Sequence, residues 1–256
     1  MTRAVVGATA ASSARPPPAR LPAARPPLAR PPAARLGGHG QPGVLFVLEG
    51  IDRSGRSTHA SRLEAHIRYT GRGVARTSLA TSLLSGDRIR AAKRDRRTDP
   101  SGMALLYAAD LAERVEQVVL PSLRAGLVVI ADRYCWTPMA RAEARGVNAA
   151  WLNALFSFLP PPDGVLFLDV DAETSLVRRT DEPDPYEAGL DLGLAADVRE
   201  SYRLFQARLY ACFDRYAERD GFTRIPAAGL ADEVWDGLLP IADAVLAARA
   251  STAGRV

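Results

Sequence analysis

The fold is decided by one stretch of the chain, Leu45-Phe46-Val47-Leu48-Glu49-Gly50-Ile51-Asp52-Arg53-Ser54-Gly55-Arg56-Ser57-Thr58. Its apolar run 45–48 predicts a buried strand, Gly50 and Gly55 bound a loop, and an amphipathic helix follows. The spacing matches the phosphate-binding loop G-x-x-x-x-G-K-[ST], except that Arg56 stands in place of lysine. An ordinary strand–turn–helix connection is the alternative. The stretch therefore favours a buried strand that leads through a phosphate loop into a helix.

The residues of this loop have the chemistry that a polyphosphate requires. Gly50 and Gly55 let the backbone curl so that successive N–H groups point at phosphate oxygens, and the following helix adds the positive end of its dipole. We expect Arg56 to reach the outer phosphates and the Ser57 hydroxyl to ligate Mg²⁺. The guanidinium of arginine is wide and planar, whereas the ammonium of lysine is a compact charge, so the two need not fit the same loop. Lys93 is the sole lysine of this arginine-rich chain, which makes an arginine at position 56 less surprising.

Composition bounds the class of protein. With 256 residues, 47% of them hydrophobic, the chain can bury a full core, which favours one domain plus a tail. Its longest apolar runs have the length of a strand, so no membrane span is expected. Cys135 and Cys212 suggest no disulfide framework and predict a reducing, cytoplasmic location. The three histidines lack metal-ligand spacing, which argues against a zinc site.

The first 42 residues are predicted to form a disordered tail. From Ala14 they repeat an Ala-Arg-Pro-rich unit of five residues, which cannot bury enough surface to fold. A transit-like peptide, a basic arm, an SH3-type ligand, and a linker or misplaced start codon remain open as interpretations. Residues 1–43 hold six of the 33 basic residues and none of the 29 acidic ones, so the rest is nearly neutral. We therefore expect no nucleic-acid binding by the folded part.

Strands alternate with helices along residues 43–250, the predicted domain. Apolar runs predict strands at 45–48, 74–77, 126–131, 164–169 and 222–225, and helical patterns lie at 60–69, 101–123, 149–159, 172–179, 195–219 and 232–248. This alternation predicts a three-layer α/β/α sandwich around a five-stranded parallel sheet. The polar, proline-broken segment 180–187 resembles a mobile lid.

A second candidate site follows the strand at 126–131. Asp132 and Arg133 come directly after it, where ligands of parallel sheets bind. The carboxylate can hold a metal-bound water, and the guanidinium can grip a phosphate. A strand end with a local ion pair is the alternative.

Taken together, these stretches resemble the thymidylate kinase (dTMP kinase) family of phosphate-loop nucleoside monophosphate kinases. The resemblance covers about residues 44–248 and depends on the loop stretch 46–58, on Leu105-Leu106-Tyr107-Ala108-Ala109, on Asp132-Arg133-Tyr134, and on Arg179 before a lid that ends in Tyr186-Glu187. It implies transfer of the ATP γ-phosphoryl group to dTMP, with Mg²⁺ as cofactor and a possible homodimer formed through long helices such as 101–123.

The resemblance also implies roles for individual residues. ATP would be bound by the loop residues Gly50, Ile51, Asp52, Arg53, Ser54, Gly55, Arg56, Ser57 and Thr58 together with Arg179. Arg53, Arg56 and Asp132 would be catalytic, with Arg53 stabilising the transferring phosphoryl group, and Ser57 and Asp132 would hold the metal. The acceptor would meet Asp52 at its sugar, Tyr107 at its base, and Arg133, Thr137 and Arg76 near its phosphate.

The sequence departs from the family pattern on the acceptor side. Leu111 replaces an arginine that reads the pyrimidine edge, Arg141 replaces an aromatic residue against the sugar, and Arg76 stands in a shortened motif. Two alternatives to a dTMP kinase therefore remain open: a nucleotide-binding protein with impaired transfer, and a kinase of another nucleotide or small metabolite.

Overall fold

The computed structural model describes residues 39–95 and 98–253. The strands and helices follow one another as β1 Val44–Glu49, α1 Arg56–Tyr69, β2 Val74–Ser78, α2 Gly86–Asp95, α3 Pro100–Arg114, the π-helical turn η1 Val115–Val119, α4 Leu120–Arg124, β3 Val128–Asp132, α5 Trp136–Glu143, α6 Ala149–Leu155, β4 Gly164–Asp169, α7 Ala172–Val177, the 3-10 turn η2 Leu190–Leu192, α8 Val198–Asp220, β5 Thr223–Pro226 and α9 Ala231–Ala253.

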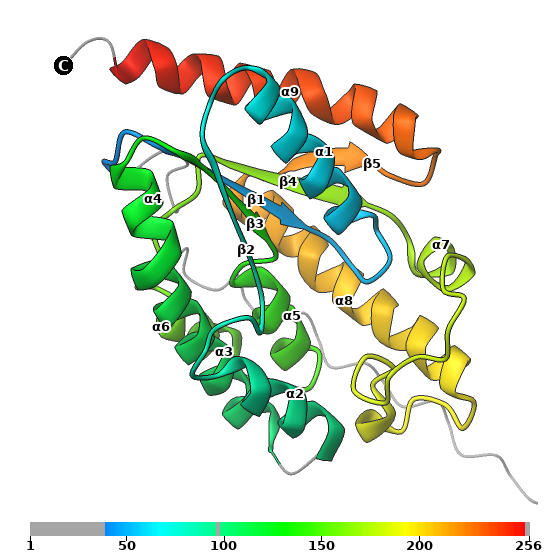
Figure 1. Cartoon of the computed structure of the whole chain (residues 1–256). Coiled ribbons are helices and arrows are strands. Elements are labelled where there is room, and N and C mark those ends of the chain that lie inside the picture. The colour runs from blue at the N-terminus through cyan, green and yellow to red at the C-terminus, as the bar shows by residue number, and fades with distance from the viewer. Residues whose placement is uncertain (1–38, 96–97, 254–256) are drawn as a thin grey trace, which may run out of the picture.

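The five strands form one parallel sheet in the order β2-β3-β1-β4-β5. Figure 1 shows α1 and α9 on one face of this sheet and α3, α4, α5 and α8 on the other. All six residues of β1 are buried, as expected of a central strand covered on both faces. The predicted three-layer sandwich with five parallel strands is thereby confirmed. Its central strand leads directly into the glycine-bounded loop.

Strand register determines which residues meet at the carboxyl edge of the sheet. Leu48 of β1 pairs with Asp132 of β3, so the acidic end of β3 lies beside the loop that follows β1. On the other side of β1, Glu49 pairs with Phe167 of β4. The order of the strands therefore brings the two candidate sites of the sequence to one place, as is usual for ligands of parallel sheets.

The structure refines several predicted helices. The helix expected at 101–123 consists of α3, the π-helical η1 and α4. Pro121 has no N–H to donate into the preceding turn, and the wider π-helical turn before it accommodates this residue. The short helix α5, which carries Thr137 and Arg141, was not predicted. A proline near its start and an arginine on its buried face obscure its apolar period.

Most of the predicted tail, residues 1–38, lies outside the described residues. The last part of it packs on the domain: His39 Nε2 lies 2.8 Å from a carboxylate oxygen of the buried Asp163, and Arg249 of α9 donates to the carbonyl oxygen of Gln41 at 2.6 Å. No helix among residues 39–95 and 98–253 combines the length and apolar character that a membrane span requires.

Candidate active site at the carboxyl edge of the sheet

The loop between β1 and α1 has the backbone that its two glycines permit. Gly50 has a φ of 149°, and a Cβ on it would lie 2.8 Å from the carbonyl oxygen of Leu168, so a larger residue does not fit. Gly55 adopts a φ of 96° and caps the start of α1. Arg53 also has a positive φ, 60°, although it is not glycine. This curled backbone gives the loop the form of an anion-binding nest at a helix N-terminus.

Arg56 is buried and directed into the loop. Its Nη1 donates to the carbonyl oxygens of Gly50, at 2.6 Å, and Ile51, and to Ser54 Oγ at 2.9 Å. Its Nε lies 3.4 Å from a carboxylate oxygen of Asp132. Burial and the neighbouring Arg133 charge lower the pKa of Arg56 to about 10, so the guanidinium is a fixed positive charge at neutral pH.

The two predicted metal ligands are neighbours. Ser57 Oγ, in the first turn of α1, donates to Asp132 Oδ2 at 2.6 Å. A hydroxyl and a carboxylate are oxygen ligands of the kind that Mg²⁺ takes, with water and substrate phosphates filling its other positions. The residues present therefore fit the metal that the sequence predicts.

On the acceptor side, Asp52 is the centre of a buried cluster of charges. Its carboxylate accepts hydrogen bonds from Arg133, from Arg141 at 3.3 Å and from Gln206 Nε2 at 3.1 Å. Burial opposes ionisation of Asp52, but the two guanidinium groups outweigh it and hold its pKa well below the usual range. Asp52 is consequently an anion with a fixed orientation.

A second chain of hydrogen bonds orients Arg133. This residue has a φ of 74°, and its Nη1 donates to Thr137 Oγ1 at 2.9 Å. Thr137 Oγ1 in turn donates to Glu49 Oε2 at 2.6 Å, and Glu49 Oε1 accepts the N–H of Tyr134 at 2.8 Å. Glu49 is fully buried, and this burial raises its pKa despite these donors. The guanidinium of Arg133 is thereby held between Thr137 and Asp52.

The segment after α7 closes over the phosphate loop. Arg53 forms an ion pair with Asp181, and Arg179 Nη2 donates to Glu187 Oε2 at 2.5 Å. A cavity of about 580 Å³ lies between this segment and the loop, lined by residues that include Arg56, Ser57 and Thr58. Its polar walls and size suit a polyphosphate, and seven of the ten predicted ATP-binding residues line it.

Two predicted acceptor residues have different surroundings. Tyr107 is only 1% exposed, and its hydroxyl lies 3.3 Å from Arg141 Nη1 inside the acceptor side of the site. Arg76 is not brought together with the others, because its side chain crosses to α1, where Nη1 donates to Ser61 Oγ at 2.9 Å and pairs with Glu64. Its position on β2 places it on the opposite face from Thr77.

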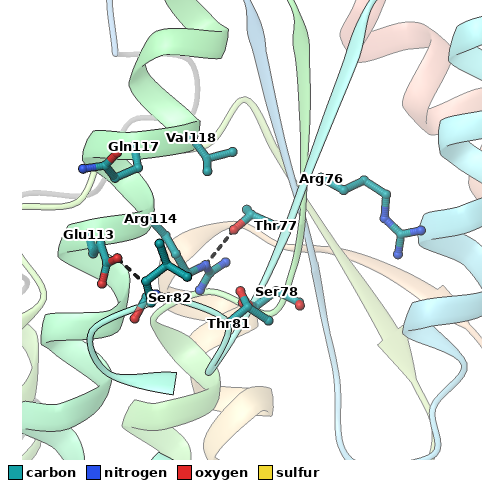
Figure 2. Close-up of a pocket in the computed structure, with 10 residues that line it drawn as sticks. Arg76, Thr77, Ser78, Thr81, Ser82, Glu113, Arg114, Gln117 and Val118 are labelled. Carbon is teal, nitrogen blue, oxygen red and sulfur yellow. Dashed lines mark hydrogen bonds between the residues drawn. The ribbon is translucent and has the colours of Figure 1, made fainter. Parts of the chain in front are cut away.

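Figure 2 shows this difference beside a separate cavity of about 540 Å³. The cavity lies between the end of β2, the loop after it, and α3 with η1. Within it Arg114 Nε donates to Thr77 Oγ1 at 2.6 Å, and Glu113 accepts the N–H of Leu83 at 3.1 Å. The Arg76 side chain points away from these residues.

Three residues that orient Asp52 and Arg133 were not predicted as such. Arg141 was noted only as a departure, yet it contacts both Asp52 and Tyr107. Gln206 lies in the middle of α8 with no local motif around it, and only the fold brings it to Asp52. The sequence could have identified Glu49, because an acidic residue at the end of an apolar strand is expected to be buried and to need hydrogen-bond donors around it.

A nest of loop amides at the carboxyl edge of a parallel sheet, with a buried cation and paired metal ligands, defines a phosphate-loop nucleotide-binding protein. Comparison with known proteins narrows this class. The family model "Thymidylate kinase" matches residues 48–234. The chain therefore belongs to the thymidylate kinase family.

Individual relatives agree with this assignment. The chain is 33% identical over 181 residues to "Probable thymidylate kinase 2" of Saccharolobus solfataricus, covering 70% of this chain and 84% of that protein. It is 37% identical to "Probable thymidylate kinase" of Pyrococcus abyssi, covering 62% and 81%. With "Thymidylate kinase" of Caenorhabditis elegans it shares 34% identity, over 53% of this chain and 67% of that one.

Proposed function

We propose that this protein is a dTMP kinase, which transfers the γ-phosphoryl group of ATP to dTMP and forms dTDP and ADP. The observation that carries the proposal is that two guanidinium groups meet at the carbonyl oxygen of Gly50. Arg56, in the loop that also carries Ser57, donates to this oxygen at 2.6 Å, and Arg133, held by Asp52 and Thr137, donates to it at 3.4 Å. A donor and an acceptor phosphate can thus bind next to each other.

The reaction forms a bond between a phosphate oxygen of dTMP and Pγ, while the bond from Pγ to the bridging oxygen of ADP breaks. Such a transfer needs positioning and neutralisation of oxygens more than covalent chemistry. Arg56 supplies a fixed charge below the outer phosphates, and Arg53 supplies a guanidinium at the mouth of the loop. Ser57 and Asp132 would hold Mg²⁺, which when bound neutralises further charge on the phosphates.

The acceptor nucleotide is held by groups that are already ordered. Arg133 donates to its phosphate, and the Asp52 carboxylate accepts from its sugar hydroxyl. Arg141 and Gln206 keep Asp52 in place, so the hydroxyl meets an oriented anion. Since Tyr107 is 1% exposed, its ring must be uncovered before the base can stack on it.

The test is ADP release by the purified protein with Mg-ATP against a panel of nucleoside and deoxynucleoside monophosphates. Turnover highest with dTMP supports the proposal. If turnover is highest with another monophosphate, that nucleotide is the acceptor in place of dTMP, and the mechanism of phosphoryl transfer is unchanged. ATP binding in calorimetry without turnover on any acceptor would overturn it and favour a nucleotide-binding protein with impaired transfer, and recovery of turnover in Arg56→Lys would then identify the cause.

Two further proposals concern the protein's surroundings. The resemblance to the family implies a homodimer formed through long helices such as α3, on which Leu105 is 52% exposed. Sedimentation should show a dimer that Leu105→Glu converts to monomer, and a wild-type monomer at all concentrations would contradict this.

The second proposal is a cytoplasmic location, with which the free thiols of Cys135 and Cys212 are in keeping. Fluorescent tagging of the full chain in its host tests this location.

A further inference from the structure

Lys93, on helix α2, is directed into the acceptor side of the site. Its Nζ lies over the ring of Tyr107, 5.9 Å from the centroid, and over the ring of Tyr186 at 5.8 Å. The next residue, Arg94, has a side chain that is 73% exposed and pairs with Asp95. The helix thus presents one cation inward and its neighbour to solvent.

The ammonium group has aromatic partners rather than hydrogen-bond acceptors. Among the described residues, Lys93 Nζ has these two ring contacts and no hydrogen bond to a protein oxygen. The side chain is partly exposed, so its three N–H donors are available to water or to a bound ligand. Burial and Arg141 lower the pKa of Lys93 to about 8, with Arg133 acting in the same direction and Glu187 and Asp52 against it.

The surroundings of the Tyr107 ring define what this donor can meet. One turn further along α3, Leu111 is fully buried and offers no hydrogen bond. A planar base stacked on the Tyr107 ring at about 3.5–4 Å would bring one edge close to the ammonium. Arg141 already uses donors on Asp52 and on the Tyr107 hydroxyl. Lys93 uses none on an oxygen of the described residues, so it is the cation of this side whose donors are all available to a ligand.

We propose that Lys93 determines base specificity by donating a hydrogen bond to a carbonyl oxygen on the edge of the acceptor base stacked on Tyr107. The inference rests on the proposed function, because it concerns the same acceptor. Thymine and uracil carry an oxygen acceptor at position 4, whereas cytosine carries an amino donor there. An ammonium facing that edge favours a 4-oxo pyrimidine and disfavours a 4-amino pyrimidine.

The kinetic test compares Lys93→Met with Arg94→Met, which removes a charge from the same helix without entering the site. For each variant of the full chain, kcat and KM are measured with dTMP and with dCMP. We expect Lys93→Met to lower the ratio of kcat/KM for dTMP over dCMP by roughly 10- to 100-fold, the range for a hydrogen bond to a charged group. Lys93→Arg should retain part of the ratio, and Arg94→Met should change it by less than about twofold.

A second measurement uses the fact that Lys93 is the sole lysine of the chain. Reductive methylation with ¹³C-formaldehyde labels only Lys93 and the α-amino group, giving two methyl signals in an NMR spectrum. Saturation with dTMP should shift the Lys93 signal and leave the α-amino signal unchanged, whether or not turnover occurs. This readout does not depend on the folding of a variant.

The outcomes separate the inference from the proposed function. If the wild type phosphorylates dTMP but Lys93→Met and Arg94→Met show the same selectivity, the role of Lys93 is wrong and the function stands. A Lys93 signal that stays fixed at saturating dTMP overturns the inference as well. If no monophosphate is phosphorylated and none moves the signal, both proposals fall.

Discussion

Replacing Arg56 by lysine tests how the phosphate loop uses its unusual cation. All three strong hydrogen bonds of the guanidinium run through a single nitrogen, Nη1, to the carbonyl oxygens of Gly50 and Ile51 and to Ser54 Oγ. These contacts therefore do not use the paired N–H groups of the planar guanidinium that distinguish arginine from lysine. Arg56 behaves here as a point charge.

The structure sets the size of the effect. Nη1 has two hydrogens for three oxygens, whereas an ammonium has three, but the lysine chain is one bond shorter. We expect these differences to offset, so that Arg56→Lys changes the free energy of unfolding by no more than about 1 kcal/mol. Arg56→Met removes the charge, strands buried carbonyl groups and leaves Asp132 without its cation, which should cost about 3–5 kcal/mol.

Denaturant unfolding of both variants measures this difference, and ADP release measures its consequence. Arg56→Lys should keep kcat within about tenfold of the wild type at pH 7, while Arg56→Met should lower it by about 10²–10³-fold. The burial that lowers the pKa of Arg56 would also lower that of a lysine here, whose ordinary pKa of about 10.4 already lies below that of arginine. Activity of Arg56→Lys should therefore decline at a lower pH than activity of the wild type. A lysine variant as unstable or inactive as the methionine variant would refute the reasoning.

The remaining predictions concern the residues around the loop. Arg53→Ala should lower kcat by roughly three to five powers of ten with little change in ATP affinity by calorimetry, and unchanged turnover would remove Arg53 from the mechanism. Ser57→Ala should raise the Mg²⁺ concentration for half-maximal activity at least about tenfold, and an unaltered Mg²⁺ titration would contradict its role as a ligand. Arg76→Ala should leave KM for dTMP within about twofold and stability within about 1 kcal/mol, because its contacts are with the surface of α1. A large rise in that KM would show that Arg76 swings into the site.

The sequence predicted the sheet because each strand is a compact apolar run between loop residues. Val44–Glu49 and Gly164–Asp169 are buried almost throughout. Such continuous apolar runs are too short for a helix, so the sequence indicates strands. Helix ends were harder to predict, since they depend on contacts elsewhere. The predicted helix 149–159 ends at Leu155, well before the prolines at 160–162, and α5 was missed because its buried face includes Thr137 and Arg141.

The donor side of the site was predictable for a different reason. Its loop is continuous in sequence, so the spacing of Gly50, Gly55 and Ser57 by itself indicates the conformation of the loop. The acceptor side combines α2, α3, α5 and α8, and no local pattern states that Lys93, Arg141 and Gln206 will meet near Asp52. Leu111 and Arg141 were recognised as departures, but only the fold shows that the Arg141 charge lies between Asp52 and Tyr107.

The arginines around the loop differ in how firmly the protein holds them, and this difference indicates their roles. Arg56 is buried, Arg133 is partly exposed, and both are bonded to fixed acceptors, so they present a constant charge to bound phosphates. Arg53 is held by Asp181 in an ion pair whose side chains are 39% and 56% exposed, and solvent screening leaves such a pair little net contribution to stability. Its guanidinium can therefore exchange this carboxylate for a phosphate oxygen at little cost. Because catalysis depends on contacts that strengthen as charge moves in the transition state, the loosely held Arg53 is the arginine best suited to follow the transferring group.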